Sequence, residues 1–211
     1  MARTTDANTR VEVTGAIIAG GTSRRMGVDK RGLLVEGIPL LRRVASALAA
    51  VSDELVVSCR RDSPPEPALL PPPGARLAFD RLAEAGPLAG VEAALAASEG
   101  ELVLVVACDM PWLAPDVLRL LLGEAHRHPE ADAVALRTGR GPEPLLCVYR
   151  RRVLPTVTRL LDGGERRMHA LLAAIPMREV PPAAWRVADP GGRTAVNLNV
   201  PTDLTGPDAG S

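Results

Sequence analysis

The sequence predicts a single α/β domain built on a doubly wound, mostly parallel sheet. Short apolar runs that end at glycine, proline or aspartate alternate with segments of helical periodicity, and this alternation indicates strands joined by crossover helices. The length of 211 residues suits one such domain, and a hydrophobic fraction of 46% is enough for a sizeable core. The pattern shows no internal repeat and no second domain.

The expected strands are short and follow one another at intervals that leave room for helices. Residues 13–19 are apolar up to Gly20-Gly21 and predict a buried first strand, whereas residues 101–107, the most apolar run, are expected at the sheet centre. Residues 63–74 are dense in proline and predict an irregular surface connector. The other expected strands cover residues 54–58, 75–79, 131–137 and 145–150, and the expected helices cover residues 40–50, 88–98, 116–127, 151–161 and 168–174.

The two ends of the chain are polar and differ from the segment between them. Residues 1–12 predict a disordered lead-in, residues 13–204 the folded domain, and residues 205–211 a flexible tail. Residues 201–204 are expected to start a last helix.

The overall composition argues against several functions. The 25 basic and 25 acidic residues cancel, and only 2% of residues are aromatic, so neither a basic nucleic-acid surface nor base-stacking platforms are expected. The 3 cysteines are scattered without metal-binding or disulfide spacing, and no apolar run is long enough to span a bilayer. We therefore expect a reduced, cytoplasmic protein without nucleic-acid or membrane partners.

The first strand leads into a glycine-rich loop, residues 19–30, which ends at Lys30, the only lysine of the chain. Glycine lets backbone N–H groups approach an anion closely, and Arg24 or Arg25 with Lys30 would neutralise phosphate charge. The loop has neither the Gly-Lys-Ser/Thr of a P-loop nor the Gly-x-Gly-x-x-Gly of dinucleotide-binding folds. On spacing alone, phosphate binding and a plain turn both stay open.

Asp109 follows the expected central strand directly. Ligands of open α/β sheets bind outside the carboxyl ends of the strands, so this carboxylate is expected to face the glycine-rich loop. Mg²⁺ is usually held by one or two carboxylates together with substrate phosphates. Asp109 is therefore a candidate Mg²⁺ ligand, with capping of the next turn as the alternative.

Five motifs occur in a characteristic order between residues 17 and 203. They are Ile18-Ala19-Gly20-Gly21-Thr22-Ser23-Arg24-Arg25-Met26-Gly27-Val28-Asp29-Lys30, Gly86-Pro87-Leu88-Ala89-Gly90 preceded by Asp80, Cys108-Asp109-Met110-Pro111, Gly164-Glu165-Arg166-Arg167, and Asn197-Leu198-Asn199-Val200-Pro201. Together they resemble the molybdenum cofactor guanylyltransferase (MobA-type) family. Asp29-Lys30 and Cys108-Asp109 are similar to the guanylyl type rather than to the sister cytidylyltransferases.

The resemblance implies a Rossmann-like nucleotidyltransferase fold of the nucleotide-diphospho-sugar transferase type and an Mg²⁺-dependent enzyme. In the implied reaction, the terminal phosphate of molybdopterin, with or without molybdenum, attacks the α-phosphorus of GTP. The products are molybdopterin guanine dinucleotide and pyrophosphate. Proteins of molybdenum insertion and molybdoenzyme maturation are the implied partners.

The resemblance also implies roles for individual residues. Lys30 would balance charge at the α-phosphate, Arg25 would hold the β- and γ-phosphates, and Asp109 would bind Mg²⁺. One position departs from the family pattern: Glu143 stands where Gln or His is usual, which puts hydrogen-bond donation there in doubt. The implied nucleotide contacts are Ala19, Gly20, Gly21, Lys30, Asp80, Gly86, Pro87, Leu88 and Asp109, and the implied molybdopterin contacts are Arg166, Arg167, Asn197 and Asn199.

Two other functions stay open at this point. A molybdopterin cytidylyltransferase, or another sugar or small-molecule nucleotidyltransferase, would differ in its choice of nucleotide. A non-catalytic carrier of finished cofactor would show no turnover.

Overall fold

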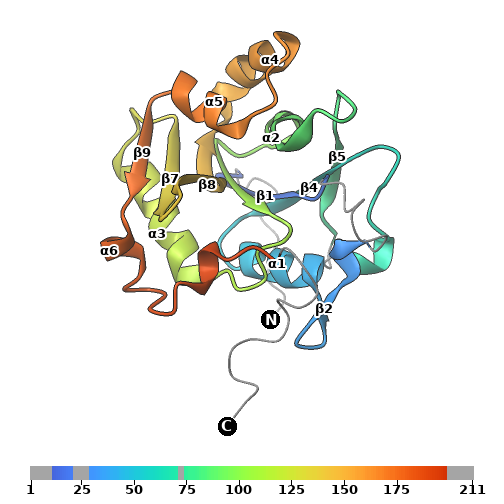
Figure 1. The fold of residues 1–211 in the computed structure, drawn as a ribbon, viewed down its shortest axis with the longest axis horizontal. Coiled ribbons are helices and arrows are strands. Elements are labelled where there is room, and N and C mark those ends of the chain that lie inside the picture. Colours follow the sequence, from blue (N-terminus) through green and yellow to red (C-terminus); the bar gives the residue numbers. More distant parts are fainter. Residues whose placement is uncertain (1–10, 21–28, 71–73, 199–211) are drawn as a thin grey trace, which may run out of the picture.

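The computed structural model describes residues 11–20, 29–70 and 74–198, which form a seven-stranded sheet between two layers of helices (Figure 1). The strand order is β5-β4-β1-β6-β8-β7-β9, and among these strands only β8 runs against the others. The predicted doubly wound, mostly parallel sheet is confirmed. Its strands are β1 (Val13–Ile18), β4 (Glu54–Cys59), β5 (Arg76–Phe79), β6 (Leu102–Ala107), β7 (Ala133–Thr138), β8 (Gly141–Arg150) and β9 (Met177–Val180).

In the described part of the chain, six α-helices cover the two faces of the sheet. On one face lie α1 (Leu40–Ala49), α3 (Pro115–Arg127) and α6 (Pro182–Trp185), whose apolar residues share one core with the sheet. On the other face lie α2 (Gly86–Ala97), α4 (Leu154–Asp162) and α5 (Met168–Ala174), which pack into a second core. None of the helices in the described part of the chain is long and apolar enough to cross a membrane.

The strand order reverses between β1 and β6, at the middle of the sheet. From β1 the chain passes through α1 to β4 on one side, and from β5 it returns through α2 on the opposite face to reach β6. The loops after β1 and β6 therefore leave in different directions, which opens the crevice where doubly wound sheets bind ligands. A hydrogen bond from Cys108 N to Ile18 O (3.1 Å) joins the two strand ends at this point.

Helix α2 lies unusually close to the sheet at Gly90. A β-carbon built on Gly90 would lie 2.9 Å from both Ile18 Cγ2 and Ser58 Oγ, atoms on β1 and β4. Because no larger residue fits this contact without displacement, Gly90 sets how near α2 stands to the central strands.

Several short elements were not expected from the sequence. Strands β2 (Leu34–Val35) and β3 (Ile38–Pro39) form a hairpin whose turn residues Glu36 and Gly37 have φ of 52° and 78°. Positive φ at both central positions is the geometry that two-residue hairpins favour. Single-turn 3-10 helices cover Lys30–Gly32, Pro67–Leu69, Arg151–Val153 and Arg193–Ala195, and strand β9 and helix α6 were also missed. The helix expected at residues 201–204 lies outside the described residues.

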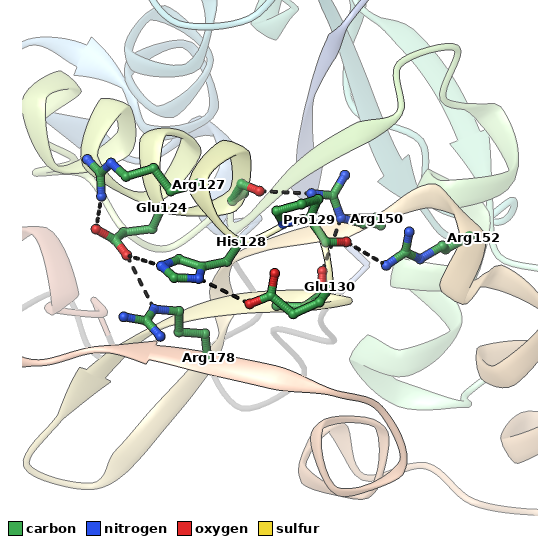
Figure 2. A network of polar contacts seen from close by, with 10 residues as sticks. Glu124, Arg127, His128, Pro129, Glu130, Arg150, Arg152 and Arg178 are labelled. Atoms are coloured by element: carbon green, nitrogen blue, oxygen red, sulfur yellow. Dashed lines mark hydrogen bonds and ion pairs between the residues drawn. The ribbon is translucent and has the colours of Figure 1, made fainter.

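A network of ion pairs fastens the end of α3 to the amino ends of β7 and β9 (Figure 2). The Glu124 carboxylate contacts Arg127, Arg178 (3.3 Å) and His128 (3.6 Å). The His128 ring also contacts the Glu130 carboxylate (3.1 Å). Parallel strands put their amino ends opposite the crevice between β1 and β6. This network is therefore part of the scaffold and not of the candidate site.

Candidate nucleotide-binding and transfer site

The end of β1 lies close to the acidic side chain of Asp80, which follows strand β5. Ala19 N donates to Ser58 O (2.8 Å), which continues the β1–β4 pairing by one residue. Asp80 follows β5 directly, and a β-carbon on Gly20 would lie 3.0 Å from its Oδ2. A larger residue at position 20 would push Asp80 away by a few tenths of an ångström, so Ala19, Gly20 and Asp80 form one closely packed wall of the crevice. Gly21, also expected here, lies outside the described residues.

Asp80 is half-buried, and hydrogen bonds to Ser58 and Cys59 at the end of β4 orient it. Its Oδ1 accepts a hydrogen bond from Ser58 Oγ (3.2 Å), and its backbone N donates to Cys59 O (3.0 Å). Burial raises the pKa of the Asp80 carboxyl, while Ser58 and the charge of Arg60 act in the opposite direction. The result is an oriented acceptor that is already partly desolvated before a ligand arrives.

The expected Gly86–Leu88 turn stands at the beginning of α2. Gly86 has φ of 70°, a conformation that glycine adopts without strain, and Pro87 occupies the first turn of the helix, where its missing N–H costs nothing. Gly86 and Pro87 are exposed, whereas the Leu88 side chain is fully buried in the second core. Leu88 therefore has only its backbone to offer to a nucleotide.

Lys30, Asp109 and the segment before residue 199 meet at the opposite wall. Lys30 Nζ donates to Leu198 O (3.2 Å), a contact between residues 168 positions apart. Leu198 N donates to the backbone carbonyl of Asp109 (2.8 Å), so Leu198 contacts the Lys30 side chain and the Asp109 backbone. The structure thus brings together the predicted cation and the predicted metal ligand. Arg25, the third predicted catalytic residue, lies outside the described residues.

The Asp109 carboxylate is suited to a bound cation. Its Oδ1 is buried and has no hydrogen-bond partner among the described residues. Burial raises the pKa of Asp109, while the positive charge of Lys30 opposes this effect. A buried carboxylate oxygen without a partner is costly, and a divalent cation with its oxygen preference is a fitting partner for it. No group of three potential metal-ligating side chains occurs in the part of the chain that the structure describes, so substrate and solvent oxygens would complete the shell.

Arg31, next to Lys30 in the chain, is a buried residue beside the site that the sequence reasoning did not single out. It is buried, and its guanidinium donates to Asp29 Oδ2 (2.7 Å), Ser63 O (2.7 Å) and Ser63 Oγ (3.1 Å). The hydrogen bonds from Arg31 lower the pKa of Asp29, although burial acts in the other direction. Arg31 thus ties the end of the glycine-rich loop to the proline-dense segment, which is more than the surface connector that was expected. Its proximity to the loop was the only available signal.

The two arginines expected at molybdopterin have partners within their own segment. Arg166 Nη1 donates to Leu161 O (2.8 Å), and Arg167 pairs with Glu165 (2.7 Å), which lowers the pKa of Glu165 to about 2. Arg167 is nevertheless 81% exposed in its side chain, so the Glu165 contact is open to exchange with another anion. Arg166 O lies 3.7 Å from the β-carbon position of Gly86, which places this segment beside the α2 turn.

Asn197 stands next to Leu198 at the Lys30 wall. Its Oδ1 is buried and has no hydrogen-bond partner among the described residues, as is also true of Asp109 Oδ1. Most buried polar atoms have a hydrogen-bond partner, so these two oxygens on neighbouring segments are candidates for contact with a polar ligand. Asn199, the second expected asparagine, lies outside the described residues.

The fold and this crevice define the class of protein as a nucleotidyltransferase. A solved structure titled molybdopterin-guanine dinucleotide biosynthesis protein A, from Archaeoglobus fulgidus, superimposes with a TM-score of 0.74 at 26% identity, covering 90% of this chain and 94% of that one. A family model described as the MobA-like NTP transferase domain matches residues 15–179. The chain belongs to this MobA-like NTP transferase family.

Two relatives support the same assignment at the level of sequence. A protein named "Probable molybdenum cofactor guanylyltransferase" from Chloroflexus aggregans is 36% identical over 198 residues, which is 91% of this chain and 91% of the relative. Another of the same name, from Natronomonas pharaonis, is 45% identical over 141 residues, covering 66% of this chain and 68% of the relative.

Proposed function

We propose that the protein transfers GMP from GTP to the terminal phosphate of molybdopterin and releases pyrophosphate. The observation that carries the proposal is the meeting of Lys30 and Asp109 at the strand-order reversal, in a chain that matches relatives named as guanylyltransferases along nearly its whole length. The domain that performs the reaction is residues 13–204.

The transfer needs position and charge more than covalent help from the protein. An oxygen of the acceptor phosphate forms a bond to the α-phosphorus of GTP, and the bond from that phosphorus to the bridging oxygen of the β-phosphate breaks. Negative charge grows on the α-phosphoryl oxygens and on the leaving pyrophosphate. Lys30, held toward the crevice by Leu198 O, supplies positive charge at the α-phosphate, and Arg25 is assigned to the β- and γ-phosphates.

Asp109 holds the divalent cation in this proposal. Bound Mg²⁺ would neutralise phosphate charge and fix the orientation of the triphosphate. Asp109 is directed by the Leu198 contact to its backbone, and its buried oxygen lacks another partner among the described residues.

Asp80 and the turn at Gly86 are assigned to the guanine and its ribose, together with the backbone of Ala19, Gly20 and Gly21. Guanine presents an N1–H and an exocyclic amine, and a carboxylate accepts from both. Cytosine lacks this pair of adjacent donors, so Asp80 supports a choice of GTP over CTP. The exposed Gly86 and Pro87 leave the base room beside the helix start.

Molybdopterin is assigned to two segments, one at the Lys30 wall and one beside the α2 turn. Asn197 offers a buried oxygen without a partner in the described structure, and Arg166 and Arg167 offer guanidinium groups near the α2 turn. Arg grips phosphate through a fork of two N–H groups, so Arg167 would exchange Glu165 for the acceptor phosphate. Asn199 belongs to the same assignment.

The reaction fits a reducing compartment, which we take to be the cytoplasm. Cys59, Cys108 and Cys147 are all free and buried in the described structure. Proteins of molybdenum insertion and molybdoenzyme maturation would supply the acceptor or take the product.

The proposal is tested by pyrophosphate release with Mg²⁺ and molybdopterin in parallel reactions with GTP, CTP, ATP and UTP. We expect release with GTP that depends on molybdopterin. Lys30→Ala and Asp109→Asn should each lower the rate about 10³-fold or more, as loss of a key cation or metal ligand does in phosphoryl transfer. Release with CTP in place of GTP would assign the protein to the cytidylyl reaction, and no release from folded protein with any nucleotide would refute catalysis.

The single lysine allows a second test that needs no acceptor. An amine-directed reagent at neutral pH can label only Lys30 and the chain terminus, because every other basic side chain is arginine or histidine. GTP with Mg²⁺ should protect Lys30 from labelling, with the terminal amine as the internal control. Equal labelling of Lys30 with and without GTP would remove Lys30 from the nucleotide site.

A further inference from the structure

Arg31 is buried directly beside Lys30 in the chain, and its guanidinium is fully engaged by protein oxygens. The side chain is only 10% exposed, and burying a charge costs free energy unless it is paired and hydrogen-bonded. Nε donates to Asp29 Oδ1 (2.8 Å), Nη1 to Ser63 O (2.7 Å), and Nη2 to Asp29 Oδ2 (2.7 Å). Because all three nitrogens donate within the protein, Arg31 is not arranged to bind a substrate phosphate itself.

The contact between Asp29 and Arg31 spans Lys30, which lies between them in the chain. Asp29 Oδ1 also accepts from Arg31 N (3.0 Å), so the Asp29 side chain caps the single-turn 3-10 helix Lys30–Gly32. Leu33 N donates to Lys30 O (3.1 Å), which closes the same turn. Hydrogen bonds therefore hold the backbone on both sides of Lys30, and this turn sets the direction in which the lysine side chain leaves the chain.

The side chains of Lys30 and Arg31 are anchored in different segments. Arg31 reaches the backbone and the hydroxyl of Ser63, which lies shortly after the end of β4. Lys30 instead reaches Leu198 O (3.2 Å), a residue that also contacts the backbone of Asp109. Arg31 thus fixes the turn to the segment after β4, while the turn presents Lys30 to the opposite wall of the crevice.

This anchoring matters because a lysine side chain is not rigid by itself. Its ammonium is a compact charge on a flexible stem of four carbons, so its position depends on the backbone that carries it and on its acceptors. Groups that stabilise a transition state must be held close to their working geometry, and displacement of the supporting residues lowers the rate.

We propose that Arg31 is a positioning residue for Lys30, and that its contacts with Asp29 and Ser63 hold the turn from which the ammonium reaches the α-phosphate. The inference rests on the proposed function, which assigns the charge at the α-phosphate to Lys30. Loss of Arg31 should therefore change the order of the Lys30 side chain even without a nucleotide, and it should lower kcat more than it weakens GTP binding.

The first test observes Lys30 directly in the nucleotide-free full chain. Because Lys30 is the only lysine, protein made with lysine carrying carbon-13 at Cε gives a single set of lysine signals in a proton–carbon correlation spectrum. The paired protons on Cε have separate resonances when the side chain is held and merge when it rotates freely. We expect separate resonances in the wild type and merged resonances in Arg31→Gln.

Arg150→Gln is the matched control for the loss of a buried arginine. The Arg150 side chain is 8% exposed and donates to Ala131 O (3.0 Å) and Ala125 O (2.8 Å), at the end of β8 that lies away from the crevice. Both substitutions should lower the melting temperature, whereas only Arg31→Gln should change the Lys30 signals. The melting curves also show that each variant is folded at the temperature of the spectra.

The second test compares kcat and KM for GTP in the transfer reaction. Arg31→Lys keeps a cation at the buried position but lacks the planar fork that joins Asp29 to Ser63, so the test does not depend on the folding of Arg31→Gln alone. Both Arg31 variants should lower kcat by about 10-fold to 100-fold and change KM less, because the charge that Lys30 balances grows in the transition state. Arg150→Gln should keep a kcat near that of the wild type.

The outcomes separate this inference from the proposed function. If the Lys30 signals of Arg31→Gln equal those of the wild type, or if Arg150→Gln changes them equally, the inference is overturned and the transfer assay still decides the proposed function. A wild-type kcat in Arg31→Lys would also overturn the inference, because the fork would then be dispensable. If the wild type transfers no nucleotide, the proposed function fails, and the spectra still decide whether Arg31 holds Lys30.

Discussion

The contact between α2 and the central strands allows a sharp prediction for Gly90→Ala. In a helix, alanine is favoured over glycine by about 0.5–1 kcal/mol because it restricts the unfolded chain. At Gly90 the added methyl group would lie 2.9 Å from Ile18 Cγ2 and Ser58 Oγ, both in well-packed positions. Overpacking of a core costs typically about 1–3 kcal/mol, so the substitution should destabilise the protein.

Gly123→Ala in α3 is a matched control for the same chemical change. The nearest atom to its β-carbon position is Arg127 Nη2 at 3.4 Å, the mobile end of a long side chain. The gain in helix propensity is common to both substitutions and cancels in their difference. Gly90→Ala should therefore be less stable than Gly123→Ala by about 1–3 kcal/mol.

Thermal unfolding measures this difference directly. For a chain of 150–250 residues, 1 kcal/mol shifts the melting temperature by about 2–4 °C, so the two variants should differ by roughly 2–12 °C. Gly123→Ala should melt at or slightly above the wild-type temperature. Equal melting temperatures for the two variants would contradict the tight α2–sheet contact.

Three further predictions concern charged side chains. Arg31→Ala should lower the free energy of unfolding by about 2–3 kcal/mol in urea titrations, because it leaves the Asp29 carboxylate and the Ser63 backbone oxygen without their donor. A decrease in the free energy of unfolding smaller than that caused by substituting an exposed arginine would contradict this role. Asp80→Asn should weaken GTP binding about tenfold or more in calorimetric titrations and CTP binding much less, and equal losses would remove Asp80 from base recognition. Burial raises the pKa of Glu54, but donors including Thr14 Oγ1 (2.6 Å) outweigh it and lower the pKa below its ordinary 4.5. The stabilisation of the fold by ionised Glu54 is therefore present above the unfolded-state pKa and is lost as the pH falls through the folded-state pKa. Glu54→Gln should flatten the dependence of the free energy of unfolding on pH below about pH 4.5. An unchanged slope of the free energy of unfolding against pH would refute the assignment.

The predicted helices and the central strands agree closely with the structure. The helix expected at residues 168–174 has the bounds of α5, and the run at residues 101–107 became β6 in the sheet interior. Their apolar periodicity is long enough to outweigh local ambiguity. The hairpin of β2 and β3 escaped notice because each strand has only two residues, too few to show an alternating pattern.

Strand β8 shows how tertiary pairing overrides local signals. The prediction began this strand at residue 145, because Pro142 and Pro144 read as a turn, yet β8 begins at Gly141. Proline is tolerated where the ladder is irregular, and the register shift between β7 and β8 provides such a place. The sequence contains no local signal for that shift.

The candidate site was predictable in its parts but not in its assembly. Motifs identified Lys30, Asp80 and Asp109 as separate candidates, and the structure places each of them at the crevice. The contact that joins Lys30 to Leu198 depends on tertiary packing, which periodicity alone does not determine. Arg31 was missed because a buried arginine has no sequence signature apart from its partners.

The hydrogen bond from Lys30 to Leu198 has a consequence for the timing of protein synthesis. A ribosome that adds about 5–20 residues per second needs roughly 8–34 s to cover the 168 positions between these two residues. During that interval the emerging chain already carries Lys30, but the Leu198 carbonyl that accepts from it does not yet exist. The nascent polypeptide therefore lacks this contact of the candidate site until residue 198 has been added, long after Lys30 has left the ribosome.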